Sequence, residues 1–302
     1  MKLVQINPKG YCKGVVRAIN IAVNTAKSHP NENIYILGMI VHNTYVTEAL
    51  NQYNITTLYD TNKSKFELLD EINNGIVIFT AHGIDDKVVN YAKNKGLQTI
   101  NASCQDVLQT RNNIINYLNQ GYEVLYIGKK NHPEAEAIMS ISKKIHLISS
   151  LNDIALTQLN NSKIYVTNQT TMSILEVKIY FDKIQEKYPQ ALIEDEICNA
   201  TSMRQMAILN TKDLDLLYVV GDIKSNNSNK LKEIALNHGI KNVRLIASCQ
   251  EIQESDLNCE TVAVTSGAST PSYLTNQVIS TLKNYISTKK LVIPSIDITK
   301  IL

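Results

Sequence analysis

The sequence lacks a strong excess of charge of either sign. Its 30 Lys and Arg residues face 28 Asp and Glu residues, which leaves a formal net charge of +2. The basic residues occur as scattered pairs such as Lys129 and Lys130, whereas proteins that bind nucleic acid usually gather them in one stripe. We therefore expect no nucleic-acid partner.

Long hydrophobic runs are also missing. No apolar run approaches the roughly 18 residues that a membrane span requires, and residues 1 to 12 show neither the apolar stretch nor the cleavage site of a secretory signal. These absences predict a cytoplasmic protein that does not enter a membrane. In such a reducing compartment its five cysteines should not form disulfides, which leaves metal binding, catalysis or packing as their roles.

What the sequence does contain is twelve short β-rich runs that alternate with segments of helical periodicity, a pattern typical of parallel α/β units. At 302 residues the chain exceeds what one hydrophobic core usually supports, so two or three domains are expected. The runs form three sets of four: 3–7, 33–38, 55–60 and 75–81; 97–102, 122–128, 145–149 and 163–167; 191–197, 216–221, 243–247 and 261–265.

A cysteine follows the first run of each set. Cys12, Cys104 and Cys198 are separated by 92 and 94 residues, about the length of a small domain. Polar residues follow the second run of each set (His42, His132, Ser225) and the fourth run (His82, Thr170, Ser269). Such self-similarity predicts an α/β fold of three similar parallel-sheet domains with approximate threefold symmetry.

The predicted domains cover residues 13–104, 105–198 and 199–285, followed by a C-terminal tail over 286–302. The strand within residues 1–12 could complete either the first or the third domain. In every domain the polar residues fall at the carboxyl ends of the strands, where open parallel sheets bind ligands. We therefore expect them to line one central cavity.

The three spaced cysteines each lie at a strand-to-helix junction, where the helix dipole and unpaired N–H groups favour a thiolate. Structural zinc sites usually contain close CxxC pairs, and this chain has none. A cubane iron–sulfur cluster normally takes four cysteines, so three ligands would leave one iron open for substrate. Cys249 and Cys259 fall outside the repeat and are expected to be structural.

Several motifs together resemble a known enzyme family. They are GYCKGVVRAI, IVHN, AHG, ASCQDV, HPE, NQTTMS, EICNATSMRQ, VVGDIKSNNSNKL and TSGASTPSYL, in order between residues 9 and about 275. This set resembles the 4-hydroxy-3-methylbut-2-enyl diphosphate reductases, which catalyse the last step of the non-mevalonate isoprenoid pathway. The resemblance implies a trefoil of three α/β domains around one central [4Fe-4S] cluster. It also implies a reaction in which two electrons and two protons remove the C4 hydroxyl as water, giving isopentenyl and dimethylallyl diphosphates.

The resemblance further implies a role for individual residues and partners. Reduced ferredoxin or flavodoxin would supply electrons. The cluster ligands would be Cys12, Cys104 and Cys198, with an open apical iron. The catalytic residues would be Glu134 as the proton source, Thr170 as its relay and His132 as support. Substrate contacts would come from His42, His82, His132, Thr170, Thr171, Ser225, Asn226, Asn227 and Ser269; Asn226 stands where many members have serine, and its amide can still donate.

Two other functions remain open at this point. One is a thiol-dependent hydrolase or transferase with Cys104 as nucleophile and His82 or His132 as its base. That hypothesis leaves Cys12 and Cys198 unexplained. The other is a binding protein or iron–sulfur sensor that uses the cavity without turnover, although a passive diphosphate site has little need of an acid such as Glu134.

Overall fold

The computed structural model describes residues 1–159 and 161–302, and all twelve predicted strands are present in it. They form three four-stranded sheets in which every neighbouring pair is parallel, so the predicted α/β class with three similar parallel sheets is confirmed. Within the described residues, no helix is both long and apolar enough to cross a membrane.

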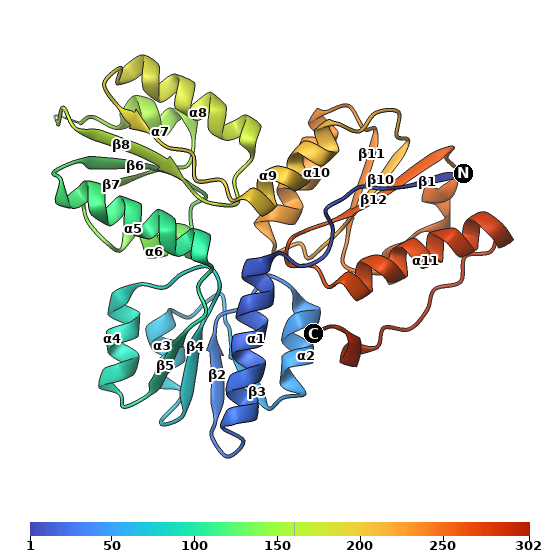
Figure 1. Cartoon of the computed structure of the whole chain (residues 1–302), viewed down its shortest axis with the longest axis horizontal. Helices are drawn as coiled ribbons and strands as arrows, with labels where there is room; N and C mark the ends of the chain where they lie inside the picture. The colour runs from blue at the N-terminus through green and yellow to red at the C-terminus, as the bar shows by residue number, and fades with distance from the viewer. Residues whose placement is uncertain (160) are drawn as a thin grey trace. The chain divides into compact units, whose positions relative to one another are not determined.

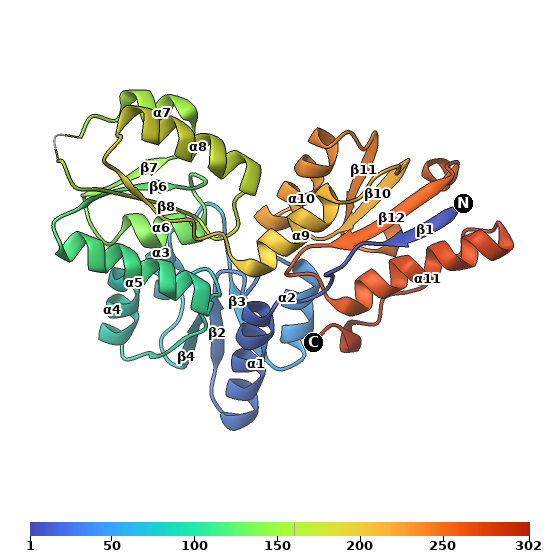
Figure 2. The same ribbon diagram turned by 45° about the horizontal axis from the view of Figure 1, so that its top comes forward.

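The three sheets share one strand order. Figures 1 and 2 show the strands and the helices around them from two directions. The first, in the order β3-β2-β4-β5, contains β2 (Ile34–Leu37), β3 (Ile55–Leu58), β4 (Ile76–Phe79) and β5 (Gln98–Asn101). The second, β7-β6-β8-β9, contains β6 (Glu123–Ile127), β7 (Ile145–Ile148), β8 (Ile164–Asn168) and β9 (Leu192–Ile193). The third, β11-β10-β12-β1, contains β1 (Lys2–Gln5), β10 (Leu216–Val220), β11 (Asn242–Ile246) and β12 (Thr261–Ser266).

Each strand that leads to one of the spaced cysteines lies at an edge of its sheet. β5 pairs with β4 and β9 with β8, the strands that precede them in the chain. β1 pairs with β12, from the other end of the chain, with Leu3 opposite Val262. The strand before each cysteine therefore occupies the same place in all three sheets.

The helices that begin after the strands are α1 (Lys13–Ser28), α2 (Thr44–Asn51), α3 (Lys65–Asp70), α4 (Asp86–Asn94), α5 (Gln105–Asn119), α6 (Pro133–Met139), α7 (Leu151–Leu156), α8 (Ile174–Lys187), α9 (Asn199–Leu209), α10 (Asn226–Asn237) and α11 (Ser272–Thr288). Short 3₁₀ turns follow as η1 (Cys249–Glu251), η2 (Glu254–Leu257) and η3 (Ile298–Lys300).

The second sheet illustrates how the layers form. Alternate side chains of a strand point to opposite faces, so Leu125 and Ile127 of β6 enter one hydrophobic core while Val124 and Tyr126 enter another. Helices α7 and α8 cover the first face, and α5 and α6 cover the second (Figure 1). Because both faces are buried, the central strands read as continuous apolar runs. Burial of each large aliphatic side chain stabilises the fold by about 1.5–3 kcal/mol.

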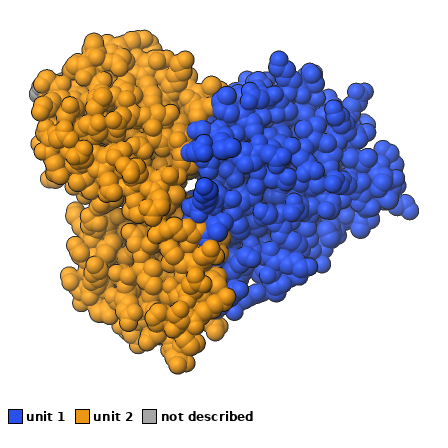
Figure 3. Space-filling view, viewed as in Figure 1, with its two compact units in different colours: residues 1–16, 41–53, 199–302 blue, residues 17–40, 54–198 orange. Residues whose placement is uncertain are grey.

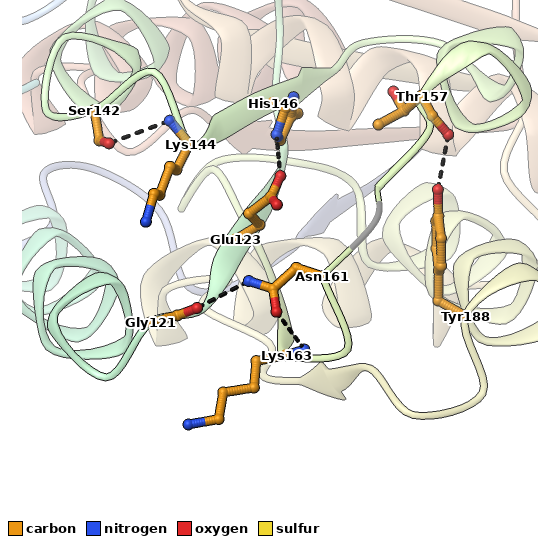
Figure 4. Close-up of polar contacts among 9 residues, drawn as sticks. All are labelled: Gly121, Glu123, Ser142, Lys144, His146, Thr157, Asn161, Lys163 and Tyr188. Carbon is orange, nitrogen blue, oxygen red and sulfur yellow. Dashed lines mark hydrogen bonds and ion pairs between the residues drawn. The ribbon is translucent and has the colours of Figure 1, made fainter.

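Polar contacts close the amino-terminal edge of this sheet, shown in Figure 4. His146 on β7 lies 2.9 Å from the carboxylate of Glu123 on β6. The Tyr188 hydroxyl donates to the carbonyl of Thr157 at 2.7 Å, which joins the segment after α8 to the end of α7. These contacts lie at the edge opposite to the carboxyl ends of the strands. They do not involve the polar loops at the carboxyl edge.

The chain divides into two compact units, coloured separately in Figure 3. One contains residues 1–16, 41–53 and 199–302 with the third sheet, and the other contains residues 17–40 and 54–198 with the first and second sheets. Helix α2 belongs to the unit of the third sheet and contacts η3 there. The domain limits at residues 104, 198 and 285 stay predictions.

Candidate active site

Apart from the three cysteines, the predicted site residues follow strands that lie side by side at the centre of each sheet. These central pairs are β2 and β4, β6 and β8, and β10 and β12. From β6 the chain continues through α6 to β7 on one side, and from β8 it continues through α8 to β9 on the other. Such a reversal in strand order opens a crevice at the carboxyl ends of the strands, and open α/β sheets bind ligands there.

One unit contains Cys12, His42, Ser225, Asn226, Asn227 and Ser269; the other contains Cys104, Cys198, His82, His132, Glu134, Thr170 and Thr171.

A single hydrogen bond recurs at all three spaced cysteines. Each cysteine donates its backbone N–H to the loop that follows the neighbouring strand. The bonds join Cys12 to the carbonyl of Ala268 (3.0 Å), Cys104 to Ala81 (2.9 Å) and Cys198 to Thr170 (3.0 Å). Directly after each cysteine a helix begins, at Lys13, Gln105 and Asn199. The repeat that the sequence spacing predicts therefore extends to the backbone hydrogen bonds.

These bonds also define which loop residues correspond. By its carbonyl, Thr170 is the counterpart of Ala81 and Ala268. The next residue, Thr171, is therefore the counterpart of His82 and Ser269, although the sequence repeat had matched Thr170 to them. The Thr171 hydroxyl accepts a hydrogen bond from the Gln169 amide at 3.0 Å. Two successive threonines thus stand where the other two loops have an alanine followed by one polar residue.

Glu134 lies at the centre of a buried polar cluster in the second sheet. Only 2% of its surface is exposed. One carboxylate oxygen accepts the Thr170 N–H at 2.8 Å, and the other accepts the Thr170 hydroxyl at 2.9 Å. The Tyr126 hydroxyl lies 3.4 Å from the first oxygen. The structure thus brings the predicted proton source and its predicted relay into direct contact.

Two histidines complete this cluster. His132 is the N-cap of α6, and its Nδ1 accepts the backbone N–H of Glu134 at 3.2 Å. The His82 ring packs edge-on against the His132 ring, with 5.8 Å between centroids. The Thr170 carbonyl in turn accepts the Cys198 N–H. A continuous set of contacts therefore runs from His82 through His132, Glu134 and Thr170 to a cysteine.

The environment of Glu134 alters its acidity. Burial raises the pKa of Glu134 from 4.5 to about 7, against the opposing effect of hydrogen bonds from Thr170 and Tyr126. The nearby negative charge of Asp106 acts in the same direction as burial on this pKa. A carboxyl group with a pKa near neutrality can hold a proton and release it under the conditions in which most enzymes work.

Hydroxyl and amide groups gather at the carboxyl edge of the third sheet. Ser225 is the N-cap of α10, and its Oγ lies 3.1 Å from Ser228 Oγ and 3.5 Å from Ser269 Oγ. Asn227 is only 5% exposed, and no described residue hydrogen-bonds to either polar atom of its side-chain amide. Backbone N–H groups at a helix N-terminus together with hydroxyls and amides suit a phosphate group.

Glycine permits the close packing of these loops. A Cβ atom at Gly221 would lie 2.3 Å from Ser228 Oγ, and one at Gly267 would lie 2.1 Å from the same atom. Any side chain at either position would therefore displace Ser228 and, with it, the Ser225 hydroxyl. The glycines of the loops after β10 and β12 keep this hydroxyl cluster compact.

Sequence reasoning missed Asp222, which anchors the segment that carries His42. Its Oδ2 accepts the Thr44 N–H at 2.8 Å and the Thr44 hydroxyl at 2.7 Å, while Oδ1 accepts the Lys224 N–H at 2.8 Å. Ser269 Oγ donates to the His42 carbonyl at 3.1 Å. Burial acts to raise the pKa of Asp222, but the hydrogen bonds from Lys224 and Thr44 outweigh it and lower that pKa. Its position directly after β10 is the one signal that the sequence offered.

The cysteines fit thiolate ligation in their local surroundings. Cys12, Cys104 and Cys198 are all partly buried, and each precedes the first residue of a helix. Over residues 1–159 and 161–302, no group of three His, Cys, Asp or Glu side chains is arranged to hold a metal ion. Because Cys12 belongs to a different unit from the other two cysteines, joint ligation stays a prediction.

Comparison with known proteins gives one consistent result. The model of the LytB protein family matches residues 3–283. Curated relatives from Bacillus cereus (strain B4264) and Bacillus mycoides (strain KBAB4) are each 48% identical over 290 residues, covering 94% of this chain and 91% of theirs. Both are named 4-hydroxy-3-methylbut-2-enyl diphosphate reductase.

Two solved structures agree with these relatives. The E-1-hydroxy-2-methyl-but-2-enyl-4-diphosphate reductase from Plasmodium falciparum superposes with a TM-score of 0.86 at 29% identity, covering 94% of this chain and 88% of that one. A structure described as (E)-4-hydroxy-3-methyl-but-2-enyl diphosphate reductase, the terminal enzyme of the non-mevalonate pathway, gives a TM-score of 0.66 at 25% identity. It covers 94% of this chain and 100% of its own.

Proposed function

Because the chain belongs to the LytB protein family and is an oxidoreductase that reduces 4-hydroxy-3-methylbut-2-enyl diphosphate, the terminal reaction of the non-mevalonate pathway, we propose how its own residues perform this reaction. The observation that carries the proposal is the buried Glu134 carboxyl, which contacts Thr170 through both oxygens.

Cys12, Cys104 and Cys198 are proposed to hold one [4Fe-4S] cluster, with three thiolate ligands and one open iron. Their repeated position before a helix supports this assignment, since helix N-termini stabilise thiolates. When bound, the cluster would pass the donor's electrons to the substrate one at a time and would supply a Lewis acid for the substrate hydroxyl. Reduced ferredoxin or flavodoxin is the proposed electron donor, and the reducing cytoplasm is the proposed compartment.

Glu134 and Thr170 are proposed to deliver a proton to the departing C4 hydroxyl. When Glu134 carries its proton, its Oε2 can donate to Thr170 Oγ1 across the same 2.9 Å contact, and the threonine hydroxyl then turns its own proton outward. The hydroxyl is a poor leaving group until it is protonated, so it leaves as water. Two electrons and a second proton complete the reduction to isopentenyl and dimethylallyl diphosphates.

His132 is proposed to orient the same end of the substrate. A neutral imidazole whose Nδ1 accepts a hydrogen bond carries its proton on Nε2. Because Nδ1 of His132 accepts the Glu134 N–H, Nε2 is the atom that can donate to a ligand. The bond to Glu134 therefore fixes both the ring orientation and the tautomer of His132.

The diphosphate is proposed to be bound by a set of neutral donors: His42, His82, Ser225, Asn226, Asn227 and Ser269. The amide of Asn227 supports this proposal, because a buried polar group without a partner is costly and a phosphate oxygen would satisfy it. The hydroxyls of Ser225 and Ser269 lie 3.5 Å apart at the carboxyl edge of the third sheet. Thr171 is proposed to support, with His132, the network around the substrate hydroxyl.

Anaerobic reconstitution tests the proposed function directly. The protein should bind iron and sulfide, turn brown, and convert the allylic diphosphate to both products when a reductant is supplied. Protein that stays colourless would refute the cluster. Protein that holds the cluster but leaves the substrate unchanged would favour a sensor. Hydrolysis or group transfer catalysed by iron-free protein would favour a thiol-dependent hydrolase or transferase.

The pH dependence of turnover should follow the carboxyl group of Glu134. Its raised pKa keeps the proton in place below about pH 7 and releases it above that value. A proton donor must be protonated, so kcat should fall about tenfold for each pH unit above roughly 7. Steady-state turnover with excess reductant checks this, and a flat profile from pH 6 to 9 would contradict the assigned role.

Asp222→Asn should weaken substrate binding more than it slows chemistry. The substitution removes the charge that three donors share and places an N–H group against one of them. Charge-assisted hydrogen bonds contribute about 1.5–3 kcal/mol, so KM should rise roughly 10- to 100-fold with little change in kcat. Steady-state kinetics measure both constants.

Asp215→Asn is a matched control for Asp222→Asn. The Asp215 carboxylate also accepts two backbone N–H groups, from Glu260 and Thr261, but it does so at the amino-terminal edge of the third sheet. It should lower stability and leave KM unchanged. Equal KM values for the two variants would show that Asp222 has no special part in positioning His42.

A further inference from the structure

The loop that carries Cys12 contains neither helix nor strand and is held by backbone contacts on one side. The Gly10 N–H donates to Ser266 Oγ at 2.7 Å, and its carbonyl accepts from Arg204 at 2.7 Å. Cys12 itself bonds to Ala268. All these partners belong to the third sheet or to the helix that precedes it, within one unit.

A different part of the chain holds the residue between Gly10 and Cys12. The Tyr11 hydroxyl donates to the backbone carbonyl of Ile301 at 2.9 Å. This bond joins the immediate neighbour of Cys12 to the penultimate residue, 290 positions later in the sequence. The side chain of Ile301 is itself buried, at 2% exposure, so the end of the chain is packed against the protein.

The path of the C-terminal tail, residues 290–302, brings Ile301 to this place. Figures 1 and 2 both show the tail leaving the end of α11 and returning to the neighbourhood of α2. Two side chains of α11 guide it on the way. The Gln277 amide donates to the Ser295 carbonyl at 3.0 Å, and the Tyr273 hydroxyl accepts the Asp297 N–H at 3.0 Å.

The tail also reaches a second segment of the site. Its 3₁₀ turn η3 contacts α2, whose N-cap Asn43 directly follows His42. The tail therefore touches both the loop of Cys12 and the helix next to His42. A loop without helix or strand has high conformational entropy, because few hydrogen bonds within it fix its backbone. Contacts with other parts of the protein therefore determine how many conformations the loop can adopt.

We propose that the C-terminal tail is a positioning element for Cys12, and that the Tyr11–Ile301 hydrogen bond is the contact through which it acts. The inference rests on the proposed role of Cys12 as a cluster ligand. The tail adds a contact at Tyr11 to those that Ser266, Arg204 and Ala268 make with the loop, so that the thiolate is held ready for iron. Loss of the tail should let the loop open and the cluster dissociate.

Two variants test the proposal. Tyr11→Phe removes the hydroxyl and keeps the ring, and deletion of residues 298–302 removes the acceptor together with Ile301. Tyr285→Phe is the matched control, because it removes a hydroxyl from α11 away from the Tyr11–Ile301 bond. The readout is the rate at which reconstituted protein loses its visible cluster absorbance to an excess of iron chelator.

Tyr11→Phe should lose the cluster about fivefold faster than the unmodified protein, which is the factor expected for one net hydrogen bond. The deletion should lose it at least roughly tenfold faster, since an apolar anchor is removed as well. Hydrogen exchange of residues 6–12 should accelerate in both variants, while exchange of β10 stays unchanged. That local pattern would separate positioning from general destabilisation.

Unchanged rates of cluster loss and of exchange at residues 6–12 in Tyr11→Phe would overturn the proposal, whether or not the deletion variant folds. Cys12→Ser provides the separate test of its premise. If Cys12→Ser retains a stable cluster, the proposed ligand set fails. If Cys12→Ser loses the cluster and Tyr11→Phe behaves as the unmodified protein does, only the positioning role of the tail fails.

Discussion

Glu134→Gln should abolish most turnover while the cluster and the substrate still bind. The amide keeps the size of the side chain: its oxygen can still accept the Thr170 N–H, and its NH2 group can donate to the Thr170 hydroxyl, but it has no acidic proton to deliver. General acid catalysis typically contributes about 100- to 10,000-fold, so kcat should fall by that factor with little change in KM. Steady-state turnover with excess reductant measures kcat and KM for both proteins.

Glu136→Gln is the matched control for this variant. Glu136 lies two residues after Glu134 in the first turn of α6. Its side chain is exposed, and its carboxylate lies 3.5 Å from the Lys65 ammonium. A surface ion pair of this kind contributes little to stability, so this variant should retain full turnover. Activity within threefold of the unmodified protein in Glu134→Gln would remove Glu134 as the essential proton donor.

The stability of Glu134→Gln separates a chemical role from a structural one. The folded carboxyl has a pKa of about 7 against an ordinary value of 4.5, so the folded state binds more protons than the unfolded state between these values. The unmodified protein should therefore lose stability as pH rises through this window. The glutamine variant cannot titrate and should lack this loss, which urea unfolding at pH 5 and pH 8 would measure.

The strands were predictable because their physical signal is local. Parallel strands buried on both faces appear as unbroken apolar runs, and IVIF of β4 is buried at all four positions. The run over 191–197 predicts a longer strand than the structure contains, since only Leu192–Ile193 forms one. The Glu196 N–H bonds to the Asn168 side chain at 3.1 Å instead of a strand carbonyl, and this ends the ladder early.

The contacts that complete the site were not predictable, because they join residues far apart in the chain. Thr44 and Asp222 are separated by 178 positions. Neither residue type signals the other, so only the fold reveals their pairing. An acidic residue such as Glu134, directly after a proline, can serve either as a helix-terminal acid or as a proton donor. Its position in the first turn of α6 agrees with the former, and its burial against Thr170 favours the latter.

Cys104→Ser should prevent the cluster from assembling. A serine hydroxyl is a hard and weakly acidic ligand, whereas iron–sulfur clusters select soft thiolates. The backbone bond from residue 104 to Ala81 does not involve the side chain, so the loop should keep its conformation. Reconstituted Cys104→Ser should therefore fold normally but hold little iron, with turnover below detection. Iron content and visible absorbance, measured beside circular dichroism, check this.

The threefold repeat makes this prediction stricter than a single substitution would be. Because Cys12, Cys104 and Cys198 share one hydrogen-bonding position before a helix, the three serine variants should lose iron to the same extent. Cys259→Ser is the control outside the repeat, since the thiol of Cys259 contacts Met1 at 3.8 Å and lies at the amino-terminal edge of the third sheet. If one of the three variants kept its full complement of iron, that cysteine would not be a ligand, and the open iron would need another explanation.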